Sequence, residues 1–182
     1  MNSASYPTAS VQSRRLLITL VLSLAIVVLD QVTKHAIRCS FSLGESKAVI
    51  SSLFDLTYVR NTGAVWGSLQ HQNEWLAVVS ITVLVLIALF YHYLAGGRMI
   101  FSAALGCITG GIIGNLIDRI KLGWVTDFLD FYWNASHWPS FNIADSAICI
   151  GVGLYLLASL RFTLKIKTDE HNPVNSLSNG KS

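Results

Sequence analysis

The sequence contains few charged residues. Asp, Glu, Lys and Arg together make up 13% of the 182 residues, whereas hydrophobic residues make up 52%. A soluble domain carries about 25% charged residues, so this chain lacks the charge needed to cover a water-facing globule. Its formal net charge of +3 is small and spread along the sequence, which argues against a nucleic-acid partner. The composition is that of a membrane protein.

Cysteine is also scarce, and its spacing excludes two kinds of site. The three cysteines, Cys39, Cys107 and Cys149, are odd in number and show no C-x-x-C spacing. The sequence therefore predicts neither a disulfide framework nor a zinc site. Cys107 and Cys149 lie within apolar runs, and we expect them to be small, buried, apolar side chains.

Four apolar segments are long enough to cross a membrane: residues 16–37, 75–94, 99–117 and 143–163. About 20 helical residues, at 1.5 Å each, span the roughly 30 Å of hydrocarbon. The first segment contains the small-x-small triplet Ser23-Leu24-Ala25, which is typical of a signal-peptide cleavage site. The apolar run continues past this triplet to Leu29, so we predict an uncleaved helix. The short turn at 95–98 makes the second and third segments an antiparallel hairpin.

Basic residues flank one side of these four segments. The positive-inside rule therefore places both termini and the 95–98 turn in the cytoplasm, and the longer loops 38–74 and 118–142 outside. Residues 1–13 and 166–182 are polar and are predicted to be disordered cytoplasmic tails; the segment between them, 14–165, forms the membrane domain. The basic residues concerned are Arg14, Arg15, Arg98, Arg161, Lys165 and Lys167.

The first outer loop has a β pattern. Apolar and polar residues alternate from Leu53 to Val59, which predicts a half-exposed strand, and Asn61-Thr62-Gly63 predicts a turn after it. We expect a small sheet on the outer membrane surface. The predicted fold is thus all-α and polytopic, with four transmembrane helices and a small extracytoplasmic β-rich unit.

Glycines repeat at four-residue spacing in the third segment. Gly106, Gly110 and Gly114 fall on one helix face, where the absence of side chains lets a neighbouring helix approach closely. We interpret this stripe as a packing feature.

The charged residues gather at the outer ends of the segments. Asp30 and Lys34 form an i,i+4 pair, which we interpret as structural or as support for a site. Asn115, Asp118 and Arg119 share one helix face; they form either an interfacial cap with an Asp118–Arg119 pair, or a group that holds a substrate carbonyl or a phosphate.

Two further acids are candidates for chemistry. Asp145 lies near the start of the fourth apolar segment, where an acid can simply favour a helix N-terminus, and Asp127 can be an ordinary loop acid. Asp130 lies three residues beyond Asp127 and is an alternative partner for Asp145. His137 and the sequon Asn134-Ala135-Ser136 are predicted to be surface features without a partner.

Three functions fit a cluster of carboxylates at one membrane face. In an aspartyl hydrolase, two neighbouring carboxylates share a proton, one acting as the base for a water and the other protonating the scissile carbonyl. In an ion-coupled carrier, acids bind the ion, but the inner halves of the segments lack charge and no segment contains proline. In a membrane scaffold, the clustering would have no purpose.

Four sequence blocks resemble the bacterial lipoprotein signal peptidase family, also called signal peptidase II, an aspartyl protease family. Their order and spacing match over about residues 14–165. The blocks are Asp30-Gln31-Val32-Thr33-Lys34, Arg60-Asn61-Thr62-Gly63-Ala64, Gly114-Asn115-Leu116-Ile117-Asp118-Arg119 continuing to Val125-Thr126-Asp127-Phe128, and Phe141-Asn142-Ile143-Ala144-Asp145-Ser146.

The resemblance implies that Asp127 and Asp145 are the catalytic pair. It also implies a set of residues that shape the pocket, bind substrate or hold the pair: Asp30, Lys34, Asn61, Gly63, Asn115, Asp118, Arg119, Asn142 and Ala144. One departure from the family pattern concerns selectivity, because Trp66 stands in Val65-Trp66-Gly67 where the family often has Ala-Phe.

The implied activity is that of a membrane endopeptidase without a metal or cofactor. Such an enzyme removes the signal peptide of diacylglyceryl-modified prolipoproteins just before the lipidated cysteine, at the outer face of the bacterial inner membrane. The resemblance further implies a β-rich periplasmic cradle, contact with membrane lipid and inhibition by globomycin-type cyclic peptides. We expect a monomer.

Overall fold

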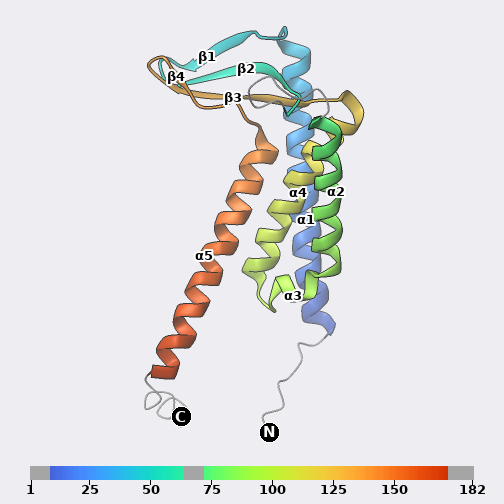
Figure 1. Ribbon diagram of the computed structural model, residues 1–182, viewed down its shortest axis with the longest axis vertical. Helices are drawn as coiled ribbons and strands as arrows, with labels where there is room; N and C mark the ends of the chain where they lie inside the picture. The colour runs from blue at the N-terminus through green and yellow to red at the C-terminus, as the bar shows by residue number, and fades with distance from the viewer. Residues whose placement is uncertain (1–8, 64–71, 172–182) are drawn as a thin grey trace.

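The computed structural model describes residues 9–63 and 72–171 as a helical bundle with a small antiparallel sheet at one end (Figure 1). Trp66 and the rest of 64–71, and the outer parts of both predicted tails, lie outside the described residues. The helices are α1 (Ala9–Ser40), α2 (Gln72–Leu89), α3 (Tyr91–Ala95), α4 (Met99–Leu122) and α5 (Ile143–His171). The strands are β1 (Ser46–Ile50), β2 (Phe54–Asn61), β3 (Val125–Trp133) and β4 (Ser136–His137).

Three of the four predicted spans are helices long and apolar enough to cross a membrane, among the residues that the structure describes. They are Val11–Ser40, Met99–Leu122 and Ile143–Leu164. The second predicted span, 75–94, is divided between α2 and the short α3, with a break at Phe90. The apolar helix at Asn73–Leu89 is shorter than the other three.

Several helices run beyond their predicted ends. Helix α1 begins at Ala9, inside the predicted N-terminal tail, and α5 continues to His171, inside the predicted C-terminal tail. Helix α4 continues to Leu122, beyond the apolar segment 99–117, and Asn115, Asp118 and Arg119 lie on its outer part, as predicted. Polar residues can continue a helix once an apolar segment has nucleated it, so these helices extend past the apolar segments that hydropathy identifies.

Helix α4 packs against α1, α2 and α5. Its glycine stripe is a packing face, as predicted, and the structure shows that the neighbouring helix is α1. A Cβ on Gly110 would lie 2.9 Å from the Ser23 carbonyl oxygen, and one on Gly106 would lie 3.0 Å from that of Thr19. On another face of α4, a Cβ on Gly111 would meet the Ala144 carbonyl oxygen. Backbones this close allow the outer ends of α1, α4 and α5 to share one polar site.

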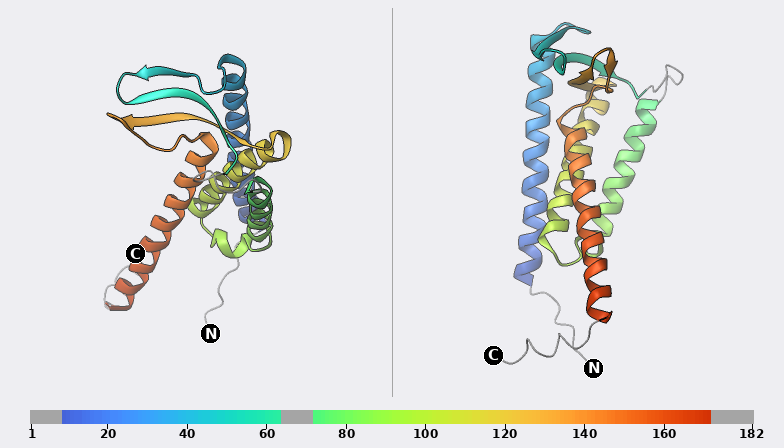
Figure 2. Two further views of the ribbon diagram at one scale, coloured as in Figure 1. Left: turned by 45° about the horizontal axis from the view of Figure 1, so that its top comes forward. Right: turned by 90° about the vertical axis from the view of Figure 1, so that its left-hand side faces the viewer.

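The sheet has the strand order β1-β2-β3-β4, with every neighbouring pair antiparallel. It lies at the end of the bundle where α1 ends and α5 begins, and it extends sideways over α5 (Figures 1 and 2). Ile37, Tyr58 and Phe128 form a small apolar cluster that joins α1 to the sheet. The strand predicted at 53–59 is confirmed as β2, whereas β3 was not anticipated in the second outer loop.

The predicted burial of the two apolar-run cysteines is wrong. Cys107 is only half-buried, and Cys149 is exposed. A side chain on the outer surface of a membrane helix faces lipid, so an apolar environment does not require burial within the protein.

Close packing at glycine predicts a matched pair of substitutions in α5. A Cβ on Gly151 would lie 2.8 Å from the Ala104 carbonyl oxygen, whereas one on Gly153 would have no atom within 4 Å. We expect Gly151→Ala to destabilise the protein by about 1–3 kcal/mol through overpacking. Gly153→Ala should be neutral or stabilise it by up to about 1 kcal/mol through helix propensity. Thermal unfolding followed by tryptophan fluorescence in detergent measures both, and equal midpoints would contradict this packing.

Candidate functional site

The two candidate acids lie where β3 meets the start of α5. Asp127, on β3, is 2% exposed, and Asp145, in the first turn of α5, is partly exposed. Two amides connect them: Asn142 Nδ2 donates to Asp127 Oδ1 (2.7 Å), and Asn115 Nδ2 donates to Asp145 Oδ1 (2.7 Å). Asn142 Nδ2 also reaches Asn115 Oδ1 (3.1 Å). The chain thus brings two carboxylates from separate elements into one hydrogen-bonded network.

Asn142 and Asp145 also form a reciprocal cap at the start of α5. The Asp145 N–H donates to Asn142 Oδ1 (3.0 Å), and the Asn142 N–H donates to Asp145 Oδ2 (3.2 Å). This is the geometry of a capping box, which satisfies donors that the first turn of a helix leaves free. The helix-cap interpretation of Asp145 therefore holds, and the same cap fixes its carboxylate toward Asn115.

The Asp127 carboxyl sits in an environment that resists ionisation. Burial is the largest effect and, together with the nearby charge of Asp145, raises the pKa of Asp127 to about 6. Hydrogen bonds from Asn61 (Nδ2 to Oδ2, 2.9 Å) and Asn142 act in the opposite direction, because they stabilise the ionised form. A carboxyl with this pKa can gain or lose a proton near neutral pH.

A turn at the end of β2 holds Asn61 in place. The Gly63 N–H donates to Asn61 Oδ1 (2.8 Å), and Gly63 has a φ of 82°, which glycine adopts without strain. The predicted turn at 61–63 is therefore present. Because the Asn61 oxygen is occupied by Gly63, its NH₂ group is left to face Asp127.

Beneath the two acids lies a buried ion cluster formed by Asp30, Lys34 and Asp118. None of the three side chains is more than 1% exposed. Lys34 Nζ lies 2.9 Å from Asp30 Oδ2 and 3.7 Å from Asp118 Oδ2, and it donates to Asn115 Oδ1 (2.8 Å). An ammonium has only donors, so it takes the Asn115 oxygen and thereby directs the Asn115 NH₂ group toward Asp145.

Each carboxylate of this cluster holds the backbone next to one candidate acid. Asp30 Oδ1 accepts the N–H of Ala144 (3.0 Å), and Asp118 Oδ2 accepts the N–H of Thr126 (2.9 Å). These two backbone positions immediately precede Asp145 and Asp127. The positions of both acids therefore depend on the same buried ions.

Arg119 occupies the border of the site. Its side chain is half-buried and lies within electrostatic range of Asp145 and Asp127, while its backbone oxygen accepts from Asn73 Nδ2 (3.3 Å). Asp118 does not form a separate cap with Arg119. Its carboxylate instead reaches Lys34, Arg38 (3.6 Å) and the backbone N–H of Thr126.

Asp130 belongs to another part of the sheet. Its carboxylate contacts His137 Nδ1 (3.0 Å), so the expectation that His137 lacks a partner is wrong. Successive side chains of a strand point to opposite faces, so residues three apart on β3 diverge. Knowledge that 125–133 forms a strand would have separated Asp130 from Asp127.

Two residues of the network, Gln31 and Arg38, were not assigned a role from sequence. Gln31 Nε2 donates to the Gly114 oxygen (3.1 Å) and to Asp118 Oδ1 (3.2 Å), and Arg38 NH1 donates to Thr126 Oγ1 (3.0 Å). Arg38 follows Lys34 by four residues, and this helical spacing was the available signal. Across the described ranges, no group of three or more His, Cys, Asp or Glu side chains is arranged to hold a metal ion.

Comparisons with known proteins point to a single family. A family model described as Signal peptidase (SPase) II matches residues 22–161. The chain is 42% identical over 147 residues to a lipoprotein signal peptidase of Syntrophotalea carbinolica, covering 79% of this chain and 91% of the relative. It is 44% identical over 138 residues to one of Geobacter sulfurreducens, covering 74% of this chain and 86% of the relative.

The fold gives the same result. The structure is similar to a solved bacterial membrane enzyme, with a TM-score of 0.72 and 34% identity, covering 80% of this chain and 88% of that one. A second solved bacterial membrane enzyme gives a TM-score of 0.73 at 34% identity, covering 78% and 92%. Since sequence, fold and extent of the match agree, the chain belongs to the signal peptidase II family of aspartyl proteases.

Proposed function

We propose that Asp127 and Asp145 are the catalytic dyad of a membrane endopeptidase that removes signal peptides from prolipoproteins. Its substrates carry a diacylglyceryl group, and the cut falls just before the lipidated cysteine. The observation that carries this proposal is the pair of amides, Asn115 and Asn142, that join the two carboxylates. Family membership supports the activity, and this geometry supports the assignment of the residues.

The environment of the dyad suits shared-proton chemistry. With the pKa of Asp127 near 6 and Asp145 nearby, the pair holds one proton up to about pH 6. The ionised carboxylate takes a proton from a water, which attacks the scissile carbonyl, while the other carboxyl protonates the carbonyl oxygen. As the C–N bond breaks, the proton gained from water passes to the leaving amine and the other carboxylate takes back a proton from the diol hydroxyl, so the pair returns to its singly protonated state.

The remaining predicted residues support this dyad in different ways. Asp30, Lys34 and Asp118 hold the backbone beside it, whereas Asn61, Asn115 and Asn142 hold its carboxylates. Gly63 and Ala144 provide backbone N–H groups to this network. Arg119 has a half-buried guanidinium at the border of the site, and we assign it to the substrate carbonyl or lipid phosphate. Globomycin-type cyclic peptides would compete for the same site, and the enzyme acts as a monomer.

A cleavage site at the membrane surface suits both the acyl chains and the peptide bond of the substrate. The acyl chains stay in the bilayer while hydrolysis consumes a water, and a dyad at the ends of α4 and α5 meets both environments. We place this end outside the bacterial inner membrane and both termini in the cytoplasm, because the basic residues flank the opposite end of the bundle. The sheet then lies on the periplasmic side.

We also propose that α2 and α3 together form the fourth membrane span. The interruption at Phe90 is small, since Phe90 N–H donates to the Leu86 oxygen and Leu94 N–H to the Phe90 oxygen, both at 2.9 Å. The combined segment 72–95 is about 36 Å long at 1.5 Å per residue. A fourth crossing places the sheet-bearing loop 41–71 and β3 on the same side.

Removal of either acid is expected to abolish cleavage. Asp127→Asn and Asp145→Asn preserve shape but prevent proton sharing, so turnover should fall by at least about 10²–10⁴-fold. Asp130→Asn is the matched control on β3 and should stay active, because its carboxylate contacts His137 instead. A gel-shift assay with lipidated and unlipidated prolipoprotein measures the effect, and thermal unfolding confirms that each variant is folded. A fully active, purified Asp127/Asp145 double Asn variant would refute the dyad.

The pKa of Asp127 predicts the pH dependence of the reaction. Above about pH 6 the pair loses its shared proton, so kcat/KM should fall roughly tenfold per pH unit. Asn61→Ala removes a donor that stabilises the ionised carboxylate, so it should raise this pKa and move the descending limb to higher pH. Asp130→Asn should leave the limb in place. A shift of the limb to lower pH in Asn61→Ala would contradict the proposed role of this hydrogen bond.

The topology predicts the activity of alkaline phosphatase fusions, which is high only in the periplasm. Fusions after Ser52 and Pro139 should be active, and fusions after Gly97 and Ser182 should be inactive. If 72–95 does not cross the membrane, the fusions after Gly97 and Ser182 will be active and the fusion after Pro139 will be inactive. Immunoblotting for the amount of each fusion is the control.

A further inference from the structure

A cavity lies at the opposite end of the bundle, away from the dyad. It has a volume of about 540 Å³ and lies between the first turns of α1 and the α3 segment with the glycine turn that follows it. We call it the inner cavity; its lining residues are Gln12, Arg15, Tyr91, His92, Tyr93, Ala95 and Gly97. The dyad network has no residue in common with it.

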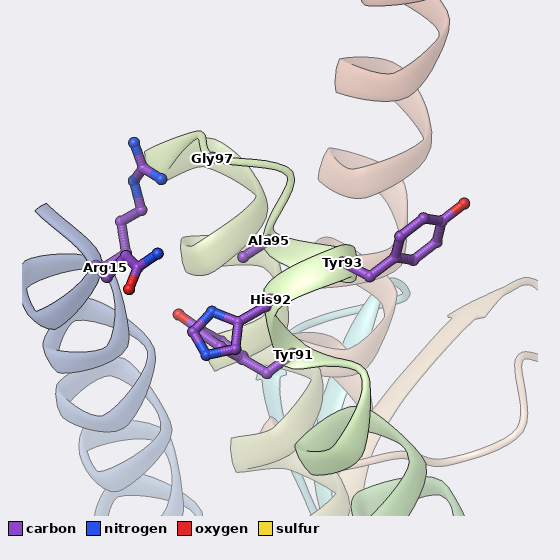
Figure 3. A pocket seen from close by; sticks show the side chains of 7 residues that line it. Arg15, Tyr91, His92, Tyr93, Ala95 and Gly97 are labelled. Atoms are coloured by element: carbon purple, nitrogen blue, oxygen red, sulfur yellow. The ribbon is translucent and has the colours of Figure 1, made fainter. Parts of the chain in front are cut away.

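Arg15 is the charged group of the inner cavity. Its Nε atom is buried and has no hydrogen-bond partner within the described part of the chain. The side chain extends from α1 toward the turn at Gly97 (Figure 3), where a Cβ on Gly97 would lie 3.4 Å from Arg15 NH1. A buried guanidinium N–H without an acceptor is costly, so this geometry calls for an acceptor that the described chain does not supply.

Hydrogen bonds from behind the cavity hold one of its lining residues, Tyr91, in place. The Tyr91 hydroxyl lies 3.0 Å from Thr19 Oγ1, and Thr19 Oγ1 also lies 2.8 Å from the Ser102 carbonyl oxygen, to which it can donate. The His92 ring points toward α1, whereas Tyr93 points away toward α5 (Figure 3). Tyrosine and histidine can donate hydrogen bonds to oxygens of a ligand.

The charge around the inner cavity has one sign. Residues 9–29, 75–117 and 146–168, which supply most of the helical structure at this end, contain no Asp or Glu; Asp169 and Glu170 lie in the last turn of α5. Arg98 follows the lining residue Gly97 in these segments, and its guanidinium is placed 3.6 Å over the Phe162 ring. The local field therefore favours an anion over a cation or a zwitterion.

We propose that the inner cavity binds the headgroup of an anionic phospholipid from the cytoplasmic leaflet. The phosphate diester accepts from Arg15, and the glycerol hydroxyls face Tyr91 and His92. The acyl chains follow the lipid-facing side of α1, where Leu16, Leu17 and Leu20 are exposed. Basic pockets between helices on the cytoplasmic side suit such headgroups. The choice of leaflet rests on the orientation proposed above, whereas headgroup binding itself does not.

Native mass spectrometry of the full chain in detergent tests this site. The probes are phosphatidylglycerol and phosphatidylcholine with identical acyl chains, so that only headgroup charge differs. We expect one phosphatidylglycerol to be retained, and Arg15→Gln to reduce its retained fraction about fivefold, as loss of one lipid-facing cation implies. Arg14→Gln is the matched control: Arg14 is the exposed neighbour on α1, outside the cavity lining, and retention should be unchanged.

A second variant keeps the test independent of the fold around Arg15. Gln12→Trp places a large side chain at the exposed rim of the cavity and should also reduce phosphatidylglycerol retention. Equal retention of the two lipids, or equal losses in Arg14→Gln and Arg15→Gln, would overturn the proposal. So would inorganic phosphate that displaces the lipid at millimolar concentration, because the site would then select a free anion. Retention is measured without peptidase turnover, so failure here leaves the proposed function unaffected.

Discussion

The buried ammonium of Lys34 is the interaction on which the site depends. It pairs with Asp30 and Asp118 where all three side chains are at most 1% exposed, and removing one partner from such a cluster costs about 3–5 kcal/mol because charge is left unpaired. With their charge compensated, the carboxylates of Asp30 and Asp118 accept the backbone N–H groups of Ala144 and Thr126. Since these residues precede Asp145 and Asp127, a single lysine determines where β3 and α5 present their acids.

The same lysine also orders the hydrogen bonds between the acids. By taking the Asn115 oxygen it turns the amide toward Asp145, and the cap of α5 turns Asn142 toward Asp127. Two amides with assigned directions keep the carboxylates near one another without neutralising either. This preorganisation allows burial and mutual repulsion to hold the pKa of Asp127 near 6 while Asn61 keeps the ionised form accessible.

The close approach of α1, α4 and α5 makes this arrangement possible. Gly110 and Gly111 let α4 touch the backbones of both neighbours, and Gly114 leaves room for the Asp30 carboxylate, which would lie 2.6 Å from a Cβ at that position. The two ends of the bundle consequently differ in charge. The outer end carries paired acids and bases, whereas the segments around the inner cavity carry arginines without acids, consistent with a peptidase site at one surface and a lipid contact at the other.

The sequence by itself determined the membrane class, three of the spans, the glycine packing face, strand β2 and the blocks that carry the family resemblance. These features are local, because hydropathy, helical spacing and alternation act over neighbouring residues. Only the tertiary structure decided which acids meet. Asp127 and Asp130 are equivalent by spacing until β3 is seen as a strand that sends them to opposite faces. The roles of Gln31 and Arg38, and the unpartnered Nε of Arg15, likewise depend on contacts between helices distant in sequence, which no local pattern encodes.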